Sequence, residues 1–138
     1  MLSKDKKIFF VKDLMLTLDK FPCVNNRTIL KEALDKMTTL KMGICCVVDN
    51  EKLSGIITDG DLRRKILEVQ KPISSFLIDD VIFHAIKNPI SINVNENINN
   101  AVCIMEKNLI WDLPVIDENK KLLGLLHLHP VVKKLLVV

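Results

Sequence analysis

The sequence predicts an α/β (α+β) fold made of two β-α-β-β-α repeats that pack together with pseudo-twofold symmetry. Three observations support this prediction. The chain has 138 residues, of which 49% are apolar and 27% charged, as expected for one compact globular domain. Helix-like and strand-like apolar patterns alternate along it. The same order of patterns occurs twice, with corresponding residues about 68 positions apart.

The internal repeat is the strongest of these observations, because matching residues recur in the same order. The pairs separated by 68 positions are Ala33 and Ala101, Met37 and Met105, Val47 and Val115, and Asp49 and Asp117. Gly55 and Gly124 follow at a separation of 69, which places one insertion in the second turn. Each copy is too short to bury its apolar faces well alone, so the two copies are expected to cover one another. We divide the chain into an N-terminal linker (1–10), a first repeat (11–71) and a second repeat (72–138).

The first repeat is predicted to begin with a short extended segment at Cys23–Val24. A helix follows, because four apolar residues have the spacing of one helical face, namely Leu30, Ala33, Leu34 and Met37. Thr28 is a candidate for the N-cap of this helix. The β-rich runs 44–48 and 53–58 are separated by polar residues and predict a hairpin. A second helix is expected over 61–69.

The second repeat shows the same order of elements. They are an extended segment at 90–94, a helix, a hairpin formed by 113–116 and 122–126, and a helix over 131–136. The first of these helices has its apolar face at Ile98, Ala101, Val102 and Met105. A short helix within 76–86 is expected to lead into this copy, as Val11–Met15 leads into the first.

Composition excludes several classes of protein. The formal charge of +3, from 20 Lys and Arg against 17 Asp and Glu, does not indicate a nucleic-acid-binding protein. No apolar run approaches the ~18 residues that span a bilayer, and the N-terminus lacks a signal-peptide pattern, so a cytoplasmic protein without membrane contact is expected. The four cysteines form no CxxC pair and lack zinc-site spacing. They are therefore expected to be reduced, buried thiols.

The sharpest local feature is the segment Gly55-Ile-Ile-Thr-Asp-Gly-Asp-Leu-Arg-Arg64, where a predicted strand passes into a predicted helix. Unpaired N–H groups at a helix start favour an anion. Thr58 adds a hydroxyl, Asp61 adds a carboxylate suited to ribose hydroxyls, and Arg63 and Arg64 can neutralise phosphate. These groups together indicate a nucleotide site. The alternative is that an aspartate only caps the helix and the arginines form a solvated face.

A repeated β-α-β-β-α unit that ends in Gly-h-h-Thr-x-x-Asp resembles a CBS domain pair, also called a Bateman module. More narrowly, three segments resemble the C-terminal regulatory region of arabinose 5-phosphate isomerases of the KpsF/GutQ type. They are Val11-Lys-Asp-Leu-Met, the Gly55–Arg64 segment and Gly124-Leu-Leu-His-Leu-His. The resemblance covers about residues 7–136, nearly the whole chain.

The resemblance implies a ligand site in the cleft between the repeats. A residue at the place of Thr58 would contact phosphate, and one at the place of Asp61 would hold ribose. Base-facing residues would come from the first two strands, namely Pro22, Cys23, Val24, Ile44 and Cys45. No catalytic residue, metal or cofactor is implied.

The second copy departs from this pattern, so unequal sites are expected. His127 stands at the place of Thr58, and Pro130 stands at the place of Asp61, where it cannot hold a ribose. His127 and His129 would share one face if the strand continued through them. They would then contact a ligand, act as structural polar residues, or bind metal with a third ligand. Trp111 is a core or interface residue, or else a stacking platform, and His84 is expected to be structural.

The resemblance implies a regulatory, ligand-sensing pair that is not an enzyme by itself, because nothing in these residues matches the catalytic sugar-isomerase domain. The effector would be a nucleotide or nucleotide sugar, and the pathway toward Kdo suggests CMP-Kdo. A homodimer is expected, with a sugar-isomerase domain in cis if the chain is a fragment. The alternative is a structural dimerisation module without a physiological ligand.

Overall fold

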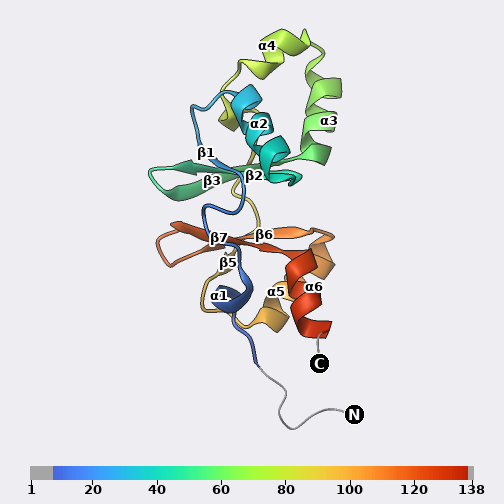
Figure 1. Ribbon diagram of the computed structural model, residues 1–138. Helices are drawn as coiled ribbons and strands as arrows, with labels where there is room; N and C mark the ends of the chain where they lie inside the picture. Colours follow the sequence, from blue (N-terminus) through green and yellow to red (C-terminus); the bar gives the residue numbers. More distant parts are fainter. Residues whose placement is uncertain (1–7, 137–138) are drawn as a thin grey trace.

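The computed structural model describes residues 8–136 and shows two α/β halves stacked with their sheets facing one another (Figure 1). Residues 1–7 and 137–138, in the predicted linker and at the end of the second repeat, lie outside the described residues. The upper sheet has the order β1 (Cys23–Asn25), β2 (Ile44–Asp49), β3 (Lys52–Thr58) and β4 (Ile86–Lys87). The lower sheet has the order β5 (Ile92–Asn93), β6 (Asp112–Ile116) and β7 (Leu122–His127).

Helices cover the outer face of each sheet (Figure 1). Those of the upper half are α2 (Leu30–Leu40), α3 (Asp59–Val69) and α4 (Ile73–Leu77), with a 3-10 turn at Val81–Phe83. Those of the lower half are α1 (Val11–Leu14), α5 (Ile98–Asn108) and α6 (Leu128–Leu136). No helix of the described part is both long and apolar enough to cross a membrane.

Strand pairing confirms the duplicated unit. In each half the first strand pairs parallel to the second, and the second pairs antiparallel to the third. The register shifts between Val47 and Val48 in one hairpin and between Val115 and Ile116 in the other. The same irregularity at equivalent positions shows that both hairpins bend alike. The predicted α/β fold of two β-α-β-β-α repeats is therefore confirmed.

The first helix of each repeat ends in the same way but starts differently. Lys41 and Leu109 close these helices with left-handed backbone conformations, at φ 55° and φ 53°. The Asn97 side chain caps α5 by accepting a hydrogen bond from the Asn99 N–H at 2.7 Å. The prediction that Thr28 caps α2 is wrong. Ile29 holds the N-cap position, and the Thr28 hydroxyl lies 3.4 Å from an Asn25 side-chain oxygen instead.

Three apolar clusters hold the molecule together. One lies between the upper sheet and its helices, and a second lies between the lower sheet and its helices. The third lies between the two sheets and comprises Phe21, Ile44, Cys46, Leu122 and Leu125. Burial of this third cluster is what joins the two repeats, because neither sheet's inner face is covered by its own helices.

The segments that lead into each repeat are exchanged between the halves. The Val11 N–H of α1 donates to the Glu96 carbonyl at 2.9 Å, and Leu16 pairs with Leu125, so this segment packs on the second repeat. Conversely, the Val81 N–H donates to the Thr28 carbonyl at 2.8 Å, which attaches the 72–87 segment to the first repeat. Strand β4, which the sequence did not predict, also joins this segment to the first repeat, because it pairs antiparallel with β3.

The cysteines are only partly as expected. Cys45 and Cys46 are fully buried on opposite faces of β2, and burial raises the pKa of Cys45 to about 12. Burial also raises the pKa of Cys23, which is half-buried. All four thiols are free, but Cys103 is exposed on α5, so the prediction that all are buried is wrong.

Candidate functional site

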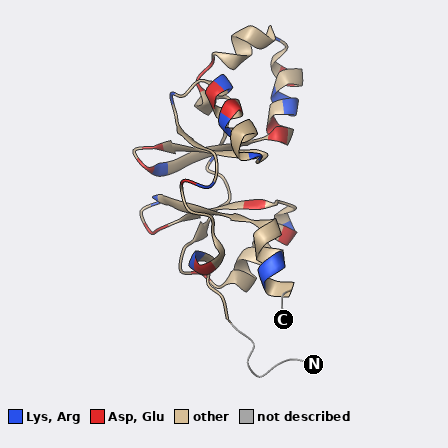
Figure 2. Cartoon of the chain, in the orientation of Figure 1, with Lys and Arg blue, Asp and Glu red and all other residues tan. Residues whose placement is uncertain are grey.

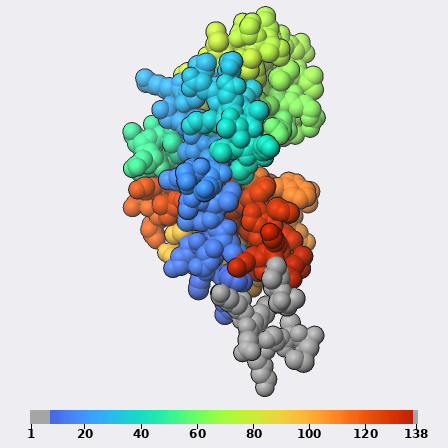
Figure 3. Space-filling model, in the orientation of Figure 1, coloured from blue at the N-terminus to red at the C-terminus, as the bar shows by residue number. Residues whose placement is uncertain are grey.

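A cleft of about 590 Å³ opens between the repeats at the start of α3. The space-filling view shows the molecule narrowing where the two halves meet (Figure 3). One wall comes from the first repeat and is formed by Gly43, Ile44, Ile56, Thr58, Asp59, Gly60, Asp61 and Arg64. Ile86 of β4, which pairs with Ile56, extends this wall. The other wall is formed by Pro89, Ile90, Leu109, Ile110, Trp111 and Asp112. This volume lies within the usual range for small-molecule sites.

Thr58 and Asp61 form a reciprocal capping box at the start of α3. The Asp61 N–H donates to the Thr58 hydroxyl oxygen at 3.2 Å. The Asp61 carboxylate oxygen Oδ2 accepts from the Thr58 N–H at 3.1 Å and from the Thr58 hydroxyl at 2.8 Å. This is a local i, i+3 arrangement, because the strand ends at Thr58 and the helix begins at the next residue.

Arg64 lies across the helix start. Its Nη2 lies 2.9 Å from Oδ1 of Asp61, while the arginine side chain stays 62% exposed. Gly60 permits this position, because a Cβ there would lie 3.1 Å from the same Nη2. Acidic and basic residues therefore follow one another along the first turns of α3 (Figure 2). The guanidinium keeps further N–H donors for an anion.

The Asp61 carboxylate has capacity beyond the cap. A carboxylate offers about four acceptor positions, and Oδ2 uses two of its own on Thr58. Oδ1 accepts from Arg64 alone among the described residues. The two interpretations of the sequence are thus compatible: Asp61 caps the helix and still presents one acceptor position to the cleft.

The second wall carries a pair that couples two strands. Asp112 on β6 faces His127 on β7, with Nδ1 of the histidine 2.7 Å from Oδ1 of the aspartate. Burial raises the pKa of Asp112, and the hydrogen bond from His127 opposes that shift. The pair occupies the place that Ile44 and Thr58 hold in the first repeat. The second repeat therefore replaces an apolar–hydroxyl pair by a hydrogen-bonded aspartate–histidine pair.

The structure brings only part of the predicted site together. Ile44, Thr58, Asp61 and Arg64 line the cleft. The other predicted residues do not line it, namely Pro22, Cys23, Val24, Cys45, Arg63, His127 and His129. Val24 and Cys45 lie in the outer core of the first repeat, and Arg63 is exposed on α3.

The histidines do not form one face. Strand β7 ends at His127, and His129 lies exposed in the first turn of α6, so the condition for a shared strand face is not met. Across residues 8–136, no three His, Cys, Asp or Glu side chains come together as a metal site needs. His84 is buried, stacks on Phe76 with ring centroids 4.3 Å apart, and lies 2.8 Å from the Asp79 carboxylate.

Sequence reasoning missed the second wall of the cleft. Pro89 and Ile90 are the second-copy counterparts of Phe21 and Pro22, and they line the cleft opposite Thr58. The repeat itself was the available signal, because a cleft between two copies draws residues from both. Trp111 is 70% exposed, so its assignment to the core is wrong. The interface and stacking alternatives stay open.

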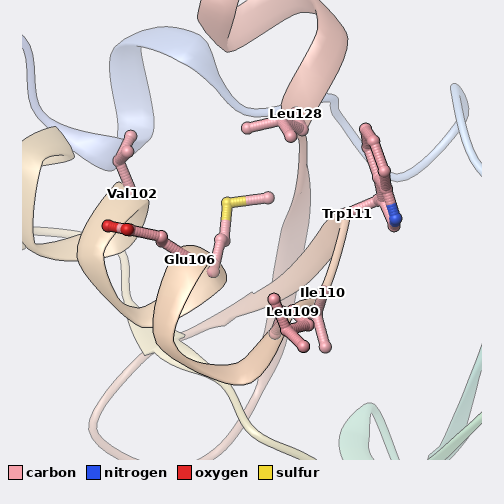
Figure 4. Close-up of a pocket in the computed structure, with 7 residues that line it drawn as sticks. Val102, Glu106, Leu109, Ile110, Trp111 and Leu128 are labelled. Carbon is pink, nitrogen blue, oxygen red and sulfur yellow. The ribbon is translucent and has the colours of Figure 1, made fainter.

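A second, apolar pocket of about 430 Å³ adjoins the cleft on the lower half (Figure 4). It is lined by Val102, Met105, Glu106, Leu109, Ile110, Trp111 and Leu128. Leu109, Ile110 and Trp111 border both the pocket and the cleft. Residues 109–111, which follow α5, therefore lie between the cleft, which has polar and apolar walls, and this apolar pocket.

Comparison with curated proteins finds relatives that extend well beyond this chain. An uncharacterized protein of Helicobacter pylori is 35% identical over 131 residues, which are 93% of this chain and 38% of that protein. Arabinose 5-phosphate isomerase KdsD of Francisella tularensis is 33% identical over 128 residues, again 93% and 38%. The chain thus spans about 38% of the length of these relatives.

Solved structures of similar fold cover nearly the whole chain. CBSX2 in complex with AMP has a TM-score of 0.79 and 27% identity, covering 91% of this chain and 95% of CBSX2. CBSX2 from Arabidopsis thaliana also aligns with a TM-score of 0.79, at 26% identity over 93% of this chain and 94% of that one. A family model described as the CBS domain matches residues 11–68 and 78–135. Two such domains in tandem make a regulatory ligand-binding module that is not catalytic by itself. The chain belongs to the CBS domain family.

Proposed function

We propose that this CBS pair is a regulatory sensor that binds a nucleotide or nucleotide sugar in the cleft at the start of α3. The observation that carries the proposal is the pairing of a polar wall, formed by Thr58, Asp61 and Arg64, with a largely apolar wall from the other repeat. A nucleotide has the same division, since its phosphate and ribose are polar and its base has apolar faces. The AMP complex of CBSX2, at 27% identity, supports this class of ligand.

Each part of the nucleotide has a complementary group. The phosphate is placed at the N–H groups of the first turn of α3, where the Arg64 guanidinium adds positive charge. A ribose hydroxyl takes the remaining acceptor position on Asp61. The base lies against the opposite wall, with Pro89 and Ile90 on one side and Trp111 on the other.

The two symmetry-related positions are proposed to differ in affinity. At the second position His127 replaces Thr58 and Pro130 replaces Asp61, so the hydroxyl and the ribose acceptor are both lost. Contacts through the remaining predicted site residues would serve this weaker position. Those residues are Pro22, Cys23 and His129, whereas Val24 and Cys45 lie in the outer core of the first repeat and make no such contact. One tightly bound nucleotide per chain is therefore expected.

The physiological setting is proposed from the relatives. Arabinose 5-phosphate isomerase KdsD of Salmonella typhimurium, like that of Francisella tularensis, is about one third identical to this chain. We therefore propose that the chain regulates a cytoplasmic isomerase of this type, with the sugar-isomerase domain in cis. CMP-Kdo is the favoured effector, because it lies downstream of that reaction.

Ligand titration tests the proposal. Thermal unfolding is measured with AMP, ATP, S-adenosylmethionine or CMP-Kdo, each up to a concentration of ~100 Kd. A ligand at that level adds about 2.7 kcal/mol, which raises Tm by roughly 10 °C for a domain of this size. Asp61→Asn is expected to reduce the shift, and Asp35→Asn, on the exposed face of α2, is the matched control. No shift with any of the four compounds contradicts the proposal.

A second candidate function is a dimerisation module, which exposed apolar residues favour. Within the described residues six of them lie on α3 and α6, with exposed fractions between 37% and 73%, namely Ile66, Leu67, Val69, Val132, Leu135 and Leu136. Such faces are typical of interaction surfaces. Native mass spectrometry distinguishes the candidates. A dimer that forms without ligand, together with unchanged behaviour of Asp61→Asn in every assay, favours the structural role.

A further inference from the structure

We propose that Asp112 selects nucleobases that carry an exocyclic amino group, such as adenine and cytosine, over their keto counterparts. The inference rests on the proposed nucleotide site and specifies which ligands that site accepts. It begins with the composition of the second wall. Among the described residues of that wall, five side chains are apolar and the sixth is the Asp112 carboxylate.

The Asp112 carboxylate is held in place through one oxygen, while its other oxygen makes no hydrogen bond within the described residues. Its side chain is 16% exposed, and His127 fixes one of its oxygens, Oδ1, from the adjacent strand at 2.7 Å. The second oxygen, Oδ2, has no hydrogen-bond partner within residues 8–136. A fixed, partly buried acceptor in an apolar wall favours a ligand that supplies an N–H donor, since a carboxylate deprived of water gains most from one.

Charge determines which end of a nucleotide reaches Asp112. The carboxylate repels phosphate, whereas the opposite wall offers the α3 N-terminus and Arg64. The phosphate therefore takes the first-repeat wall, and the base extends toward the second. An amino group on adenine or cytosine donates to Asp112. Hypoxanthine and uracil carry a keto oxygen at the same position. That oxygen and the Asp112 carboxylate are both hydrogen-bond acceptors, so the two groups would repel one another.

Matched nucleotide pairs test this inference by titration calorimetry at constant ionic strength. AMP is compared with IMP, and CMP with UMP, because the members of each pair differ chiefly by an amino group in place of a keto oxygen. The wild-type protein is expected to bind the amino member about tenfold more tightly, the worth of one charge-assisted hydrogen bond. Asp112→Asn is expected to reduce the ratio to about twofold, because an amide turns to offer either a donor or an acceptor. Asp35→Asn is the matched control and should keep the wild-type ratio.

The outcomes separate the inference from the proposed function. Binding of all four nucleotides with equal affinity overturns the inference alone and leaves the sensor in place. A preference for the amino member that survives in Asp112→Asn also overturns it, because another group would then read the base. Absence of binding for all four nucleotides overturns the inference, and the proposed function falls with it only if ATP, S-adenosylmethionine and CMP-Kdo also fail to bind.

Discussion

Replacing Asp61 with alanine is expected to destabilise the fold by about 2–4 kcal/mol, independently of any ligand. The carboxylate is 7% exposed as part of a buried residue and accepts two hydrogen bonds from Thr58 and one from Arg64. The Thr58 hydroxyl still caps the backbone N–H of residue 61 in this variant. The loss comes from the Thr58 N–H and hydroxyl donors, which are left without their acceptor at about 1–2 kcal/mol each. The Arg64 pair adds less than about 1 kcal/mol, because the guanidinium is solvated.

Asp61→Asn separates this structural role from ligand binding. The amide oxygen still accepts from Thr58, so a loss below about 1 kcal/mol is expected. Urea unfolding, with free energies extrapolated to water, measures both variants. Asp59→Ala is the control in the same turn, because the exposed Asp59 side chain makes no hydrogen bond within the described chain. If Asp61→Ala and Asp61→Asn lower the free energy of unfolding by equally small amounts, the hydrogen bonds between Asp61 and Thr58 do not stabilise α3.

Three further predictions concern packing and pH. Gly124→Ala should lower stability by about 2–3 kcal/mol, because the new Cβ would lie 2.6 Å from the Leu16 carbonyl oxygen. Gly43→Ala is the comparison: its Cβ would meet only the Asp59 side chain, so thermal unfolding should show a smaller loss. Asp112→Asn should raise Tm at pH 7, because burial raises the pKa of this carboxyl. The gain should fade as the pH falls from the raised pKa toward the usual aspartate value of 3.8, and a gain that is constant with pH would contradict this. A hydrogen bond from Lys71, and to a lesser extent one from His84, lowers the pKa of Asp79. Asp79→Asn should therefore lower Tm at pH 7 but not well below pH 3.8, where the carboxyl is protonated. An equal loss at both pH values argues against the ion pair.

The repeat and the polar wall of the cleft could be predicted because their signals are local. The apolar spacing from Leu30 to Met37 indicates a helix without reference to the rest of the chain, and it lies within α2. The Thr58–Asp61 capping box acts over three residues, so the motif alone places both side chains at one helix start. These predictions needed no knowledge of which surfaces meet.

The parts of the fold that the sequence did not predict depend on contacts between segments that are distant along the chain. Strand β4 has only two residues, and its partner Gly55 lies more than thirty positions earlier, so no periodicity reveals it. The exchange of α1 onto the second repeat likewise depends on a hydrogen bond from Val11 to Glu96. The shared face expected for His127 and His129 required the strand to continue, and Leu128 begins a helix there instead. In each case tertiary packing decided what local preference left open.

Ile44 explains how a ligand in the cleft can influence the rest of the molecule. Its side chain is 1% exposed and belongs to the cluster between the sheets, yet the residue also lines the cleft. Each repeat has its own outer core, so that shared cluster and the exchanged segments are what fix the two halves together. A ligand that touches both walls adds contacts across the same junction. Under the proposed function, occupancy of the cleft would therefore favour one relative position of the repeats, and that shift is what the pair would transmit to a sugar-isomerase domain in cis.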